Sequence, residues 1–133
     1  MIALDTNVVV RLLIDDHAAQ HAAARSLLGS GERLLLTPTV LLESDWVLRD
    51  VYGLANRDIA AAFAALCATS NVEVANEEAV AEALRLSAAG VELADALHLA
   101  AATDARAKSL ASFDRALARK AKRADARLPV TTP

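Results

Sequence analysis

The N-terminal stretch Ile2-Ala3-Leu4-Asp5-Thr6-Asn7-Val8-Val9-Val10-Arg11-Leu12-Leu13 decides the fold. Its first three residues form a short apolar run of the kind that makes a buried strand. The next three, Asp5-Thr6-Asn7, are residue types that cap helices. Apolar residues then continue from Val8 to Ile14, where the capping residues favour a helix over another strand. The stretch therefore predicts a strand that passes directly into a helix, with an acidic residue at the junction.

The same alternation of strand and helix repeats along the chain. Further short strands are expected at 34–36, 71–75 and 109–112, and residues 129–131 form either a fifth strand or a tail. Asp15 or Asp16 is expected to cap a helix that runs to the Gly29-Ser30-Gly31 break. Other helices are expected over 39–52, 56–67, 76–90, 93–106 and 114–124. Buried strands alternating with helices predict an α/β fold, three layers α/β/α with a short central parallel sheet of four to five strands, in a single domain spanning residues 1–133.

Composition excludes several classes of protein. Of the 133 residues, 55% are apolar but only 3% are aromatic. The apolar content excludes disorder, and the scarcity of aromatic residues disfavours an all-β fold or a base-stacking platform. The single cysteine, Cys67, excludes an intrachain disulfide and a cysteine-based zinc site. Neither a membrane-spanning run nor a secretory signal is evident, so we expect a cytoplasmic protein with no membrane partner.

Charge is unevenly distributed along the chain. The net charge is −3, yet residues 104–127 carry eight Lys and Arg residues and three acids. Such a basic cluster fits contacts with nucleic-acid phosphates. A solvated last helix, with cations near its C-terminal end where they suit the helix dipole, explains it equally well. The basic cluster comprises Arg115, Arg119, Lys120, Lys122, Arg123 and Arg127.

Four acidic residues stand in apolar surroundings: Asp5, Glu43, Asp95 and Asp114. Buried carboxylates are costly unless they are paired or bound to metal. In a parallel sheet, Asp5 and Asp114 would project from the carboxyl edge, and the helices carrying the other two acids would border the same crevice. A divalent cation, Mg²⁺ or Mn²⁺, would offset the repulsion among such carboxylates and would serve phosphodiester hydrolysis.

A structural explanation competes with the metal site. Asp5 and Asp114 have the residue type and position of helix N-caps, and Glu43 lies in the first turns of its helix, where a negative charge suits the dipole. Asp95 has no comparable explanation. Asp45 and Arg49, four residues apart on the Glu43 helix, are expected to form a surface ion pair.

The segments that carry the four acids resemble the four acidic motifs of PIN-domain proteins, specifically the VapC toxins of bacterial toxin–antitoxin pairs. Residues 2–13 are similar to the family's opening, and the three later segments are similar in order and spacing to its second, third and fourth motifs. These segments are residues 39–49, 94–100 and 110–115.

The resemblance implies a metal-dependent endoribonuclease that cleaves RNA, commonly tRNA or rRNA. Carried over by position, Asp5, Glu43, Asp95 and Asp114 become the metal-binding and catalytic acids, with Mg²⁺ or Mn²⁺ as cofactor. Thr6 and Asn7 would orient the first acid or its waters, and Ser112 stands where the family usually has Thr. The family's usual Arg-Asp-Phe after the fourth acid is replaced by Arg115-Ala116-Leu117, which removes an acid; Glu92 is a candidate outer ligand in its place.

The resemblance also implies partners. These are a cognate antitoxin, which inserts a segment near the active site, and a second copy of the chain in a homodimer. A catalytically silent PIN-like module that binds RNA or protein is the alternative, and the presence of all four acids favours activity.

Several side chains allow two interpretations. Arg11 and Arg115 would bind phosphate or neutralise the site, or would form plain ion pairs with an acid. His98 would assist proton transfer or be a partly buried structural residue. Trp46 and Tyr52 would form part of a subunit interface or pack in the core.

Overall fold

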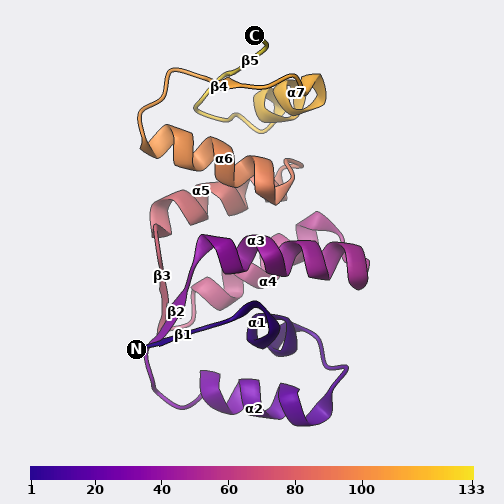
Figure 1. Cartoon of the computed structure of the whole chain (residues 1–133), viewed down its shortest axis with the longest axis vertical. Coiled ribbons are helices and arrows are strands. Elements are labelled where there is room, and N and C mark those ends of the chain that lie inside the picture. The colour runs from indigo at the N-terminus through magenta and orange to yellow at the C-terminus, as the bar shows by residue number, and fades with distance from the viewer.

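The computed structural model describes residues 1–133 and contains seven α-helices, one π-helical turn and five short strands. Figure 1 shows these elements stacked along the long axis of the molecule. Helices α1 and α2 lie at one end, followed by α3 and α4, then by α5 and α6. The C-terminal strands and α7 lie at the opposite end.

The helical bounds agree with the sequence pattern to within a few residues. Helix α1 begins at Thr6, directly after the predicted capping acid, and Asn76 is the N-cap of α5 as expected. Two predicted caps are wrong: His17 rather than Asp15 or Asp16 caps α2, and Ala55 rather than Asn56 precedes α4. The α-helices are α1 (Thr6–Leu13), α2 (Ala18–Leu28), α3 (Pro38–Trp46), α4 (Asn56–Cys67), α5 (Glu77–Ala88), α6 (Leu93–Asp104) and α7 (Arg115–Arg123).

The main sheet is parallel but small. It contains β1 (Ile2–Ala3), β2 (Leu34–Leu36) and β3 (Val72–Val74), in that order across the sheet. Ile2 is in register with Leu34, and Leu34 with Val72. The central strand is the most buried, since Leu34 and Leu36 are fully enclosed, as expected for a parallel strand covered on both faces.

The mixed α/β class is confirmed, whereas the prediction of a four- to five-stranded central sheet is wrong. The last two strands, β4 (Leu110–Ala111) and β5 (Val130–Thr131), pair in parallel with each other and form a separate sheet. Helices α5 and α6 pack against each other and lie between the two sheets in Figure 1. Because β4 follows α6, this packing takes it to the end of the molecule away from β1.

The predicted helix over residues 39–52 is α-helical only as far as Trp46. A π-helical turn, η1 (Val47–Val51), continues it, and the backbone N–H of Tyr52 donates to the Val47 carbonyl at 3.3 Å. Gly53 then ends the helix in a left-handed conformation (φ 69°), which glycine adopts without steric cost. A π turn admits one extra residue per turn, so it changes the side of the helix on which the following side chains lie.

One hydrophobic core runs through the molecule. It includes apolar side chains of α1, β2, α3, α4, α5, α6 and α7. Phe63 on α4 is fully buried and is the largest enclosed side chain. None of the helices combines the length and the apolarity that crossing a membrane requires.

Replacing Phe63 by Ala is therefore expected to destabilise the fold by about 3–5 kcal/mol, because the enclosed site would retain a cavity. Phe113→Ala is the matched control: its ring is 80% exposed, and its loss should change stability by less than about 0.5 kcal/mol. Urea unfolding monitored by circular dichroism measures both. Equal losses in the two variants would contradict the placement of the core.

Candidate active site

Asp5 and Glu43 line one cavity. Asp5 follows β1 as the N-cap of α1, but its side chain makes no capping hydrogen bond, so both carboxylate oxygens remain free. Glu43 lies in the middle of α3, which packs against α1. The cavity has a volume of about 280 Å³, and Asn7, Arg11 and Tyr52 also line it. Neither acid forms an ion pair, although Arg11 lies in the same wall.

Arg11 pairs with a different acid. Its Nη1 donates to Asp16 Oδ1 at 2.5 Å and lies 3.3 Å from the Tyr52 hydroxyl, while its Nε donates to Gln20 Oε1 at 2.7 Å. Of the two interpretations of Arg11, the ion pair is therefore observed, but with an acid outside the predicted set.

Asp95 and Asp114 interact at the other end of the molecule. Burial in the apolar first turn of α6 raises the pKa of Asp95, and the negative charges of Glu92 and Asp114 raise it further. His98 and Lys120 act in the opposite direction. Burial is the largest cause of this shift, so the fold holds the Asp95 carboxyl partly out of water beside two other acids. His98 is exposed, so it is not the partly buried structural residue considered above.

Asp114 does act as a helix cap. Its Oδ1 accepts a hydrogen bond of 3.0 Å from the Leu117 backbone N–H, as the structural explanation predicts. Ser112 contributes to the same turn, because its hydroxyl accepts a 3.0 Å hydrogen bond from the Asp114 N–H. The second carboxylate oxygen, Oδ2, makes no hydrogen bond within the protein, so capping leaves it free for another ligand.

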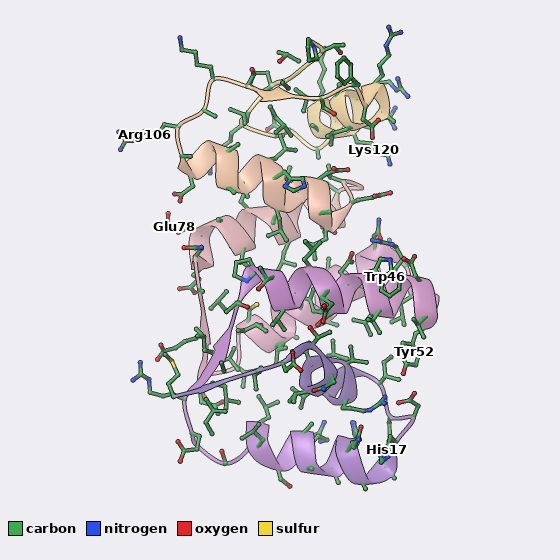
Figure 2. All side chains as sticks on the ribbon, in the orientation of Figure 1. His17, Trp46, Tyr52, Glu78, Arg106 and Lys120 are labelled. Carbon is green, nitrogen blue, oxygen red and sulfur yellow. The ribbon has the colours of Figure 1, made fainter.

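Helix α7, which Asp114 caps, carries five cations, and one of them, Lys120, acts on Asp95. All of its Lys and Arg side chains are exposed, and none forms an ion pair. Arg119 and Lys122 also line a surface hollow of about 530 Å³ together with Arg127. Figure 2 shows Lys120 on α7 at the C-terminal end of the molecule. The cations on α7 are Arg115, Arg119, Lys120, Lys122 and Arg123.

Asp45 does not lie on the surface, as the sequence had indicated. It is only 2% exposed, and it accepts a 2.7 Å hydrogen bond from Arg49, so the pair is not the surface ion pair that we expected. Burial raises the pKa of Asp45. The spacing of Leu41, Asp45 and Leu48 along one helix face indicates this burial, since both leucines belong to the core. Trp46, beside it, is 55% exposed, which excludes core packing for its indole ring.

The four predicted acids thus fall into two pairs. Asp5 and Asp114 follow strands of different sheets, and no group of three or more Asp, Glu, His or Cys side chains lies within reach of one ion. Carboxylate oxygens are nevertheless the donors that Mg²⁺ prefers. Mg²⁺ keeps several waters and is commonly bound by one or two carboxylates together with substrate phosphate.

The chain thus combines a mixed α/β fold with acids that follow β1 and β4, on α3 and in the first turn of α6. The PIN domain matches the chain over residues 2–123, and the chain therefore belongs to the PIN domain family. A search of curated proteins finds no match. PIN domains are generally nucleases, and such nucleases typically use divalent metal ions.

The elevated pKa of Asp95 has a consequence for stability. The folded protein holds the Asp95 proton more tightly than the unfolded chain does, so this group costs stability as the pH rises from its unfolded-state pKa through its folded-state pKa. Asp95→Asn is therefore expected to unfold at a higher temperature than wild type at pH 7.

The difference should vanish below about pH 3, where the aspartate is protonated in both states. Asp104→Asn replaces an exposed residue at the end of the same helix, so it should leave the melting temperature unchanged at both pH values. Thermal unfolding at both pH values measures the effect. A melting temperature of Asp95→Asn below that of wild type at pH 7 would contradict it.

Proposed function

We propose that this chain is a metal-dependent endoribonuclease that hydrolyses phosphodiester bonds in RNA, tRNA or rRNA among them. The observation that carries the proposal is the acidic pair Asp95 and Asp114 beside the unpaired cations of α7. Membership of the PIN family supplies the nuclease class. Cations that form no ion pair within the protein are available to RNA phosphates, and adjacent carboxylates are available to a divalent ion.

In this proposal Asp5, Glu43, Asp95 and Asp114 hold Mg²⁺ or Mn²⁺. When bound, the metal lowers the pKa of a water ligand and neutralises charge on the phosphate. The protein's own contribution is positioning: Asp5 is held at the start of α1, and Asp114 is fixed by its capping bond to α7. Ser112 holds the turn before Asp114 through its hydroxyl, and Thr6 and Asn7, which follow Asp5 in sequence, would orient that acid or its waters.

The partners follow from the same charges. The Asp5–Glu43 cavity has two unpaired carboxylates, which suit an Arg or Lys side chain of a cognate antitoxin. We propose that such an antitoxin restrains the enzyme, which would then act as the toxin of a toxin–antitoxin pair. A homodimer is also proposed; the exposed Trp46 and Val51 on the outer side of α3 and η1 give it an apolar surface.

A catalytically silent RNA-binding module is the second candidate. The observation that favours it is the separation of the four acids into two pairs, with no three ligands in reach of one ion. Such a protein would use the cations of α7 but would not cleave its ligand.

Purified protein, stripped with chelator, is expected to cleave total RNA only after Mg²⁺ or Mn²⁺ is restored. Asp5→Asn and Asp95→Asn should each lower the cleavage rate by about a hundredfold or more, because each removes a charged ligand. Asp104→Asn is the matched control and should cleave at the wild-type rate. Cleavage that persists in chelator would refute the requirement for a metal ion. Saturable RNA binding without cleavage, in the presence of either metal, would establish the silent module instead.

The cations of α7 are expected to set RNA affinity. The double variant Arg119→Gln/Lys122→Gln should bind RNA more weakly. The plot of log affinity against log salt should also become less steep, by about 0.7 for each phosphate of single-stranded RNA that the variant no longer neutralises. The charge-matched control Arg25→Gln/Arg57→Gln removes two exposed cations on α2 and α4. Fluorescence anisotropy over a salt series compares them. Equal decreases in both variants would mean that net charge, not α7, controls binding.

A further inference from the structure

Asp16 occupies a preformed anion site at the rim of the Asp5–Glu43 cavity. One of its carboxylate oxygens, Oδ1, accepts from Arg11 Nη1 at 2.5 Å, and the other, Oδ2, accepts from the Tyr52 hydroxyl at 2.6 Å. Arg11 and Tyr52 both line that cavity, whereas Asp16 does not. The hydrogen bond from Tyr52 and the charge of Arg11 lower the pKa of Asp16, so the carboxylate is an anion at neutral pH.

The two donors lie on helical elements that do not include Asp16, Arg11 in α1 and Tyr52 at the end of η1. Arg11 lies in the last turn of α1, and Gln20 of α2 orients its Nε. Tyr52 and Glu43 are nine positions apart, about two and a half turns of a regular α-helix, which would place them on opposite sides. The π turn η1 lies between them, and both nevertheless line the same cavity. Figure 2 shows Tyr52 on the side of the molecule where His17 lies.

Asp16, by contrast, lies in the exposed connection between α1 and α2, where His17 is tied to α2 as its N-cap. Residues 15–17 connect α1 to α2 and are all exposed. None of their backbone N–H groups donates a hydrogen bond to another backbone group. The Asp16 side chain is 44% exposed, and ion pairs with that degree of exposure contribute little to stability. Moving Asp16 away therefore costs the fold little.

A phosphodiester presents to Arg11 and Tyr52 the same kind of anion as the Asp16 carboxylate. Like a carboxylate, it carries one negative charge shared by two oxygens, and guanidinium groups bind both anions in the same way. Arg11 also lines a second cavity, of about 310 Å³, with Asn7 and Gln20. Arg11 and Asn7 thus stand between the two cavities, where an RNA strand leaving the Asp5–Glu43 cavity would pass.

We propose that Arg11 and Tyr52 form a subsite for a backbone phosphodiester of the RNA, which Asp16 occupies in the free protein and leaves when RNA binds. The inference rests on the proposed function in that it takes RNA as the ligand. Asp16 thereby acts as a built-in competitor that weakens RNA binding next to the catalytic acids.

The test measures binding of a fluorescein-labelled single-stranded RNA in chelator, so that no cleavage takes place. Asp16→Asn is expected to bind RNA about fivefold more tightly than Asp15→Asn, which removes the same charge from a neighbouring exposed residue that contacts neither donor. In the Arg11→Gln background, Asp16→Asn should give no such gain. In the Tyr52→Phe background, which lacks only the hydroxyl, Asp16→Asn should give at most half of this gain in affinity. The substitution should not disturb the fold.

Equal affinities for Asp16→Asn and Asp15→Asn would overturn the proposal, as would a gain that persists without Arg11. If no variant binds RNA, the subsite is also refuted. Inorganic phosphate tests the other source of this anion: at millimolar concentration it should displace little RNA from wild type. Phosphate that binds more tightly to Asp16→Asn, while RNA affinity does not change, would assign the site to free phosphate. The binding test does not measure cleavage. If it confirms the subsite while the separate cleavage assay finds no activity, only the enzymatic proposal is refuted.

Discussion

The packing of α5 against α6 is the contact on which the arrangement of the other elements depends. Leu86, Leu93 and Leu99 are almost fully enclosed there, and small residues such as Ala83 and Ala96 let the two helices approach closely. Because β4 and α7 follow α6 in the chain, they are carried away from β1. The division of the carboxylates into two pairs is a direct result, since one pair belongs to the α1–α3 end and the other to the α6–α7 end.

Helix α3 connects these two ends. Glu43 lies on its side toward α1, in the cavity with Asp5. Asp45, two residues later, is enclosed and is influenced by the charge of Glu92 at the start of α6. Two acids of one helix thus belong to different electrostatic environments. Arg49 compensates only the buried one, whereas the exposed one forms no ion pair within the protein and is open to a cation or a basic partner.

Local features could be predicted from the sequence, and long-range ones could not. The capping residues after Leu4 and the apolar periodicity identified the helices, and the four acids were recognised as unusual because each stands in apolar surroundings. The pairing of β4 with β5 depends on contacts between distant residues, which no local pattern encodes. The π turn after Trp46 could not be predicted because π turns have no residue signature comparable to a cap. The sequence indicates Asp16 only as a candidate cap, since its role depends on Tyr52, 36 residues away.

The division into two small sheets leaves one side of β1 and one side of β4 without a neighbouring strand. Exposed edges of this kind are where chains join one another into aggregates, and long, flat, apolar edges are the most hazardous. Each of these strands is only two residues long. So short an edge offers an incoming chain very few backbone groups to pair with. The brevity of the strands, which weakens the sheets, therefore also protects the protein from uncontrolled association at high concentration.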